Sequence, residues 1–143
     1  MRVHSFTRSF FCICTCLCAH FIGHHSFPVE VISTGGESLI SPDKSTQKQY
    51  DTLISINVIE HVQDAFQYLT GLYVSLKPGG LLIFHDRYYS NLQITDGDIY
   101  HPVRIKQKVL DHFLSAFDII FNNCNADYDG RNDSGYYVIA RKR

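Results

Sequence analysis

Two pairs of neighbouring ionisable residues each follow an apolar run, and they are the candidates for acid–base chemistry in this sequence. Glu60 and His61 come shortly after the first run, and His85 and Asp86 come directly after the second. An imidazole titrates near neutral pH and can take a proton from a reacting group, while a neighbouring carboxylate can orient the imidazole or the reacting molecule. His85, His61 and Asp86 are therefore the candidate catalytic residues.

Each of these residues also has a structural interpretation. Glu60 can accept hydrogen bonds from backbone N–H groups at the start of a helix while His61 packs beneath it, because buried polar groups are usually hydrogen-bonded. Asp86 can cap a loop, and His101 can line a binding site or lie in a solvated loop. We expect His61 to be structural and His85 to be the better candidate for contact with a reacting molecule.

The two apolar runs and the segment between them predict one βαβ unit. Residues 53–56 are apolar except for Ser55 and residues 81–84 are continuously apolar, which is typical of parallel strands covered by helices on both faces. Between them Asp64 suits the start of a helix, and Pro78, Gly79 and Gly80 stop it. A crossover through this helix lays the second strand parallel to the first. The predicted apolar stripe of the helix comprises Val62, Phe66, Leu69, Tyr73 and Leu76.

Further elements flank this unit. A short strand is predicted at residues 29–32, before a polar loop. After the unit, Pro102 suits the first turn of a second helix. Residues 117–121 and 136–140 then predict two strands joined by a polar loop at 122–134, which implies an antiparallel hairpin. The inner face of the second helix comprises Leu110, Phe113 and Phe117.

This order of elements resembles the second half of a Rossmann-like S-adenosylmethionine-dependent methyltransferase of the type 11 kind. The resemblance rests on the N-x-x-E-H-V run at residues 57–62 and the L-K-P-G-G run at residues 76–80, and it extends over residues 29–143. It implies an α/β fold, a partial methyltransferase sheet with parallel strands, crossover helices and a C-terminal antiparallel hairpin. The family's glycine-rich G-x-G-x-G turn has no match, nor has the acidic residue that holds the ribose hydroxyls. Only the C-terminal half is represented.

The resemblance also implies a cofactor and a binding site. S-adenosyl-L-methionine would be the methyl donor and a small molecule the acceptor, both held beyond the carboxyl ends of the strands. Gly36, Glu37 and Asn57 are the candidate cofactor-binding residues, with Glu37 placed where the family accepts a hydrogen bond from the adenine amino group. Glu37 can equally be a solvated carboxylate, and Asn57 can cap the following helix.

The missing first half predicts an exposed strand edge. In the family two further strands lie between the strands at residues 29–32 and 53–56, so their absence leaves the latter with an open apolar edge. A protein could associate with this edge. Two functions therefore remain open: methyl transfer to a small molecule, with activity uncertain in so short a chain, and a non-catalytic methyltransferase-like module that binds a protein.

The first 28 residues are rich in cysteine and histidine. Four cysteines alternate at positions 12, 14, 16 and 18, and four of the eight histidines lie within the first 25 residues. Zinc sites use cysteine pairs separated by two to four residues, because one intervening residue makes a strained chelate. We therefore expect no metal site, and a secreted or metal-binding cysteine protein is the weakest functional hypothesis.

The same segment contains an apolar run at residues 10–22, which follows Arg2 and Arg8 as in a targeting signal. The run is too short to span a membrane as a helix. We interpret residues 1–28 as a leader, either a targeting segment or a non-native sequence in place of the true N-terminal half. Residues 29–143 form the predicted domain, whose single cysteine, Cys124, favours a cytoplasmic location.

The composition limits the range of partners. The 143 residues are 45% hydrophobic and 19% charged, which is ordinary for one globular domain. The net charge of −1 provides no broad basic face of the kind that binds nucleic acid or anionic lipid. A small molecule or a protein is the expected partner, without nucleic acid or membrane.

Overall fold

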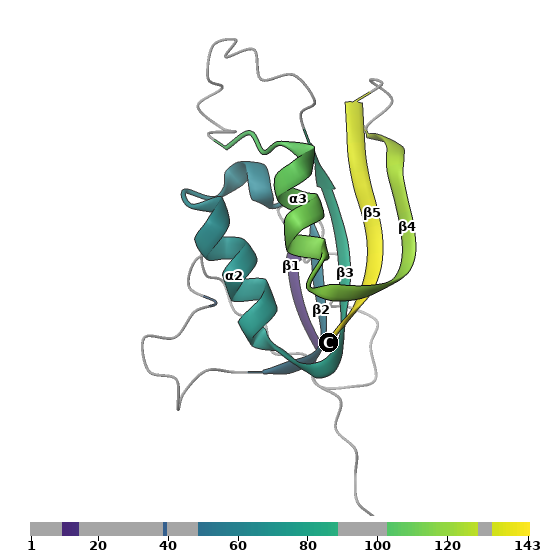
Figure 1. Cartoon of the computed structure of the whole chain (residues 1–143). Coiled ribbons are helices and arrows are strands. Elements are labelled where there is room, and N and C mark those ends of the chain that lie inside the picture. The colour runs from purple at the N-terminus through teal and green to yellow at the C-terminus, as the bar shows by residue number, and fades with distance from the viewer. Residues whose placement is uncertain (1–9, 15–38, 40–48, 89–102, 129–132) are drawn as a thin grey trace, which may run out of the picture.

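The computed structural model describes residues 10–14, 39, 49–88, 103–128 and 133–143, which build one five-stranded sheet and two helices (Figure 1). The strands are β1 (Phe10–Cys14), β2 (Tyr50–Ile56), β3 (Leu76–Arg87), β4 (Phe117–Tyr128) and β5 (Asp133–Lys142). The helices are α2 (Ala65–Ser75) and α3 (Gln107–Leu114), and a 3-10 turn, η4 (Ile59–His61), precedes α2. The strand order is β1-β2-β3-β5-β4.

The pairing of the strands confirms the predicted α/β topology. β2 and β3 are parallel neighbours joined through α2, as the βαβ prediction requires. β5 pairs antiparallel with β3, and β4 pairs antiparallel with β5, so the chain ends in the predicted hairpin. The hairpin is longer than predicted: β4 continues to Tyr128 through most of the expected polar loop. The ladder to β5 pairs its backbone even where its side chains, such as Asn122 and Asn123, are exposed.

The expectation of an open edge beside residues 53–56 is wrong. β1 pairs in parallel with β2 over residues 10–14 and 52–56, so a strand from the N-terminal segment satisfies the backbone groups of that edge. Within the described part of the chain, β1 and β4 are the outer strands. The predicted strand at residues 29–32, together with Gly36, Glu37, His101 and Pro102, lies outside the described residues.

Helix α2 confirms one prediction and corrects another. Asp64 is its N-cap, and its Oδ1 accepts hydrogen bonds from the N–H groups of Phe66 and Gln67, both at 2.9 Å. The predicted stripe is wrong at Phe66, whose side chain is 70% exposed. η4 and an extended linker separate Val62 from the helix and shift the helical register. The buried residues of α2 are Ala65, Tyr68, Leu69, Gly71, Leu72 and Ser75.

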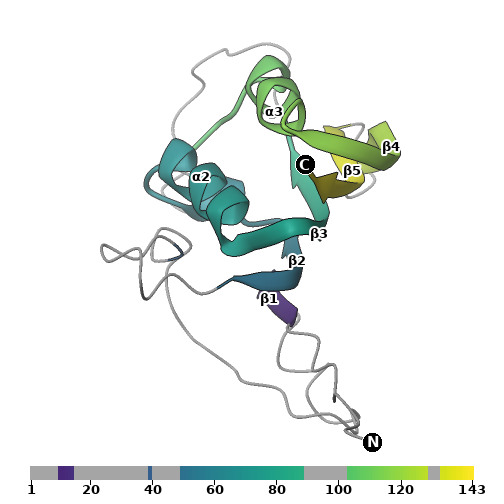
Figure 2. The same ribbon diagram turned by 60° about the horizontal axis from the view of Figure 1, so that its bottom comes forward.

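Both helices cover the same face of the sheet (Figures 1 and 2). Successive crossovers that move in one direction across a sheet stay on one face when all are right-handed, which accounts for this arrangement. The expectation of helices on both faces is therefore not met by the described residues. The buried side of the sheet includes Leu53, Leu82, Phe84, Val138 and Ala140, whereas Ile83, Ile139 and Tyr137 on the other side are partly exposed.

Helix α3 also begins later than predicted, at Gln107 and not near Pro102. Leu110 and Phe117 are buried as expected, and Phe113 packs against the same core. Phe113 makes an edge contact with Phe117, which already belongs to β4. No helix of the described part of the chain is long and apolar enough to cross a membrane.

The C-terminal end of α2 depends on Lys142. The Nζ of Lys142 donates to the carbonyl oxygens of Tyr73 and Leu76, both at 2.7 Å, and it lies 4.2 Å from the centre of the Tyr73 ring. A cation is favourable at the negative end of a helix, where carbonyl groups lack partners within the helix. Gly79, with φ of +75°, lies near the start of β3, where the pairing with β2 changes register.

Lys142→Met should lower the stability of the fold. The substitution keeps most of the apolar stem but removes both hydrogen bonds to the helix end, at a cost of roughly 1–2 kcal/mol. Thermal denaturation should show a melting temperature several degrees lower than that of the unmodified chain. Arg141→Met, at the neighbouring exposed position, is the matched control and should change the melting temperature little. Equal shifts in the two variants would contradict the role of Lys142.

Candidate functional site

The polar residues of interest gather where β2 and β3 end. Asn57 follows β2 directly and has a positive φ of 55°, a left-handed conformation that asparagine adopts more readily than most residues. Its backbone N–H donates to the carbonyl oxygen of His85 in β3 at 2.8 Å. The sharp turn at Asn57 therefore leads the chain away from the sheet and into η4, next to the end of β3.

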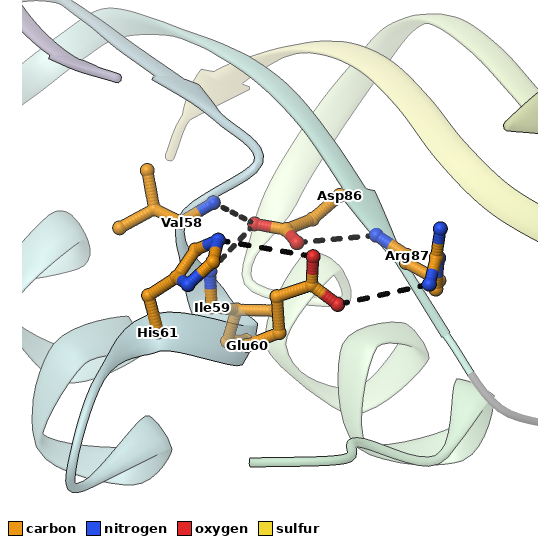
Figure 3. A network of polar contacts seen from close by, with 6 residues as sticks. All are labelled: Val58, Ile59, Glu60, His61, Asp86 and Arg87. Carbon is orange, nitrogen blue, oxygen red and sulfur yellow. Dashed lines mark hydrogen bonds and ion pairs between the residues drawn. The ribbon is translucent and has the colours of Figure 1, made fainter. Parts of the chain in front are cut away.

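Asp86 connects these two segments (Figure 3). It is fully buried, and its Oδ2 accepts hydrogen bonds from the N–H groups of Val58 at 3.0 Å and Ile59 at 2.9 Å. Its Oδ1 accepts a third hydrogen bond from the N–H of Arg87 at 3.1 Å. The carboxyl group thus joins the end of β3 to a turn 27 residues earlier in the chain.

Burial dominates the electrostatics of Asp86. Loss of solvent raises the pKa of this carboxyl to about 7, although the three backbone hydrogen bonds favour its ionised form. The negative charge of Glu60 raises the pKa further. Asp86 therefore exchanges a proton near neutral pH, which an ordinary aspartate does not.

Glu60 lies beside Asp86 with two cationic groups at the outer limit of ion pairing. Its Oε2 is 4.0 Å from Nη1 of Arg87, and its Oε1 is 3.8 Å from Nε2 of His61. The Glu60 side chain is almost fully buried, whereas 28% of the His61 side chain is exposed. Asp86 accepts the Val58 and Ile59 hydrogen bonds, which is the capping role that the structural interpretation gave to Glu60.

His85 occupies a different environment. Successive side chains of a strand point to opposite faces, so His85 lies on the helix-free face of β3 and Asp86 on the helix-covered face. The His85 ring packs edge-on against Tyr137, with ring centres 5.7 Å apart, and burial lowers its pKa. The hypothesis that Asp86 orients His85 is therefore wrong, because their side chains diverge.

The structure thus brings together Asn57, Glu60, His61 and Asp86 at the carboxyl ends of two parallel strands. Gly36 and Glu37 lie outside the described residues, so their cofactor role stays a prediction, as does the role of His101. Sequence reasoning did not include Arg87 in the site, although an arginine next to the candidate Asp86 was a visible signal. The described residues contain no cluster of three or more His, Cys, Asp or Glu side chains suited to a metal ion.

Comparison with known proteins identifies the fold. No family model and no curated protein matches the sequence. A putative methyltransferase from Bacillus halodurans C-125 is similar in structure, with a TM-score of 0.58 and 13% identity over 80% of this chain and 78% of its own. TehB from Haemophilus influenzae has a TM-score of 0.53 and 13% identity, over 76% of this chain and 39% of its own.

A third similar structure limits what the fold implies about chemistry. The [4+2]-cyclase SpnF has a TM-score of 0.51 and 12% identity, over 76% of this chain and 54% of its own. This chain thus spans between 39% and 78% of the three related structures. It has a partial Rossmann-like methyltransferase fold, and one fold can carry different reactions.

Proposed function

We propose that this chain forms the C-terminal part of an S-adenosylmethionine-dependent methyltransferase that acts on a small molecule. The observation that carries the proposal is the polar cluster of Asn57, Glu60, His61 and Asp86 at the carboxyl ends of β2 and β3. Ligands of open α/β sheets bind beyond these ends of the strands. The methyltransferase fold of the Bacillus protein supports the choice of donor.

Each residue has a proposed part in the reaction. Asn57 contacts the donor where the chain leaves β2, and Gly36 and Glu37 contact its adenosine portion. Methyl transfer is a direct displacement, so positioning carries much of the rate, and a base is needed only when the acceptor must lose a proton. The geometry favours His61 over His85 for that base, because His61 is partly exposed beside Glu60 and His85 lies on the opposite face.

The alternative function loses the feature on which it rested. A protein-binding module was expected to use the open edge of the strand at residues 53–56, and β1 pairs with that edge. The polar cluster, in contrast, is not needed by a module that binds through a strand edge. Buried carboxyl groups are costly, and their concentration at the strand ends favours a ligand site.

A titration followed by nuclear magnetic resonance tests the proposal. Millimolar S-adenosylmethionine added to the ¹⁵N-labelled chain should shift the amide signals of residues 57–61 and of Arg87, because these lie at the proposed site. The amide signals of residues 117–121, on the far edge of the sheet, serve as the internal control and should stay unchanged. Absence of any shift at residues 57–61 up to the solubility limit would refute donor binding here.

A further inference from the structure

Three consecutive backbone N–H groups fix the turn between β2 and η4. The N–H of Asn57 donates to the His85 carbonyl. The N–H groups of Val58 and Ile59 donate to the Asp86 carboxyl group (Figure 3). A carbonyl does not titrate, but a carboxyl group does. Two of the three anchors of this turn therefore depend on the protonation of one buried side chain.

The charged and titratable groups around Asp86 influence how readily it loses its proton. η4 contributes Glu60, which disfavours a second negative charge, and β3 contributes Arg87, whose guanidinium is paired with Glu60. β5 places Tyr136 opposite Asp86 in the register. The Tyr136 phenol is already hydrogen-bonded to Asp111 and Gln107. Among the described residues, His61 is a further titratable group near Asp86, through its contact with Glu60.

We propose that Asp86 is a positioning residue that regulates the candidate site: its ionised form holds Val58 and Ile59 in the turn that presents Asn57 and His61, and proton uptake loosens this turn. The link to ligand binding rests on the proposed function. The control of the turn itself does not, because it follows from the hydrogen bonds of the chain alone.

The chemistry of the carboxyl group gives the reason. An ionised carboxylate is purely an acceptor and can take all three N–H donors at once. A protonated carboxyl group carries its own O–H donor, so one oxygen turns from an acceptor into a donor that faces an N–H group. A proton on Oδ1 faces the Arg87 N–H and leaves Oδ2 as a neutral acceptor for Val58 and Ile59. Hydrogen bonds to an ionised acceptor are roughly twice as strong as neutral ones, so both bonds to the turn weaken on protonation. The turn is therefore held more tightly when Asp86 is charged than when it is neutral.

The amide signals of Val58 and Ile59 report this change directly. In the ¹⁵N-labelled chain, titrated from pH 5 to pH 9, both signals should move together with a single midpoint near neutral pH. Asp86→Asn keeps an accepting oxygen without the charge and should abolish the movement. Should this variant fail to fold, the titration of the unmodified chain still decides, since signals of Val58 and Ile59 that do not move overturn the proposal.

Two control variants separate Asp86 from other titrating groups. Asp64→Asn changes an exposed carboxylate that also accepts two backbone N–H groups, and it should leave the Val58 and Ile59 titration intact. His61→Gln removes the nearby imidazole and should leave it intact as well. Loss of the titration in His61→Gln would assign it to His61 and overturn the proposal.

The consequence for ligand binding is measured with the same sample. If only the ionised form presents the site, about a tenth of the molecules are competent one pH unit below the midpoint and about nine tenths one unit above it. The apparent dissociation constant of S-adenosylmethionine should then be about tenfold higher at the lower pH, and pH-independent in Asp86→Asn. Equal binding at both pH values would overturn the regulatory role. Amide signals that titrate in a chain that binds no S-adenosylmethionine at any pH would refute the proposed function and leave the control of the turn standing.

Discussion

S-adenosylmethionine is expected to bind this chain with a dissociation constant in the millimolar range. Enzymes commonly have Michaelis constants in the micromolar to millimolar range. The sequence lacks a glycine-rich turn and a ribose-binding carboxylate of the methyltransferase kind. A hydrogen bond to a charged group contributes roughly 1.5–3 kcal/mol, so the loss of two such contacts weakens binding by roughly 3–6 kcal/mol, or about 150-fold to 20,000-fold.

Isothermal titration calorimetry measures this constant. S-adenosylhomocysteine is the matched ligand control, and it should bind about equally weakly. The missing contacts are those that the glycine-rich turn and the ribose-binding carboxylate would make, and neither contact is to the methyl group. A micromolar or tighter constant for either ligand would contradict the argument. It would mean that residues of this chain replace the missing contacts, and Glu37→Ala would then test one of them.

The sequence predicts the centre of this fold well because its signals are local. Residues 53–56, apolar except for Ser55, and the apolar residues 81–84 lie within β2 and β3. Asp64 identified the start of α2 because an N-cap acts within a few residues of itself. Phe66 was wrongly assigned to the buried face of α2. The predicted stripe was counted from Val62, but the helix begins only at Ala65, so Val62 does not share its period.

β1 could not be predicted in the same way. Residues 10–14 lie within a longer apolar run that is typical of a leader, and their place in the sheet depends on pairing with β2, in which each partner lies 42 positions later in the chain. Periodicity detects a strand but not its partner. The expected open edge followed from assigning the sheet position beside β2 to missing strands, whereas backbone hydrogen bonding accepts any extended segment there.

The candidate site shows the same division between local and distant information. Asn57, Glu60, His61 and Asp86 were placed at the strand ends because parallel strands end at one edge. The partners of Asp86 were missed because Val58 and Ile59 lie 28 and 27 positions away. The alternation of Leu82, Phe84 and Asp86 in the sequence could have shown that Asp86 points into the core, away from the side occupied by His85.

Asp86→Asn is expected to flatten the dependence of folding stability on pH. The pKa of Asp86 rises from its ordinary value of 3.8 to about 7 in the folded chain, so the folded state binds the proton more tightly than the unfolded state. The resulting stabilisation is fully present below pH 3.8 and is lost as pH rises through about 7. A tenfold difference in proton affinity corresponds to about 1.4 kcal/mol, so between pH 5 and pH 8 the loss is roughly 2–3 kcal/mol.

Urea denaturation at several pH values measures the difference. The free energy of unfolding of Asp86→Asn, relative to the unmodified chain, should rise by roughly 2–3 kcal/mol from pH 5 to pH 8. A constant offset from the amide group facing the Arg87 N–H does not alter this slope. Asp64→Asn preserves a favourable N-cap and should run parallel to the unmodified chain. Parallel curves for Asp86→Asn as well would show that Asp86 titrates alike in the folded and unfolded states.

The sign of this effect is opposite to the effect proposed for the turn. Ionisation of Asp86 lowers global stability, because the charge must leave water, yet it supplies the acceptor that holds Val58 and Ile59. A charge that costs folding free energy but orders a ligand-binding turn is typical of functional sites, where stability is lower than the sequence could achieve. A structural carboxylate selected for stability alone would be replaced by a neutral acceptor. Asp86→Asn should therefore lose both the pH dependence of stability that Asp86 supplies and the pH response of the turn.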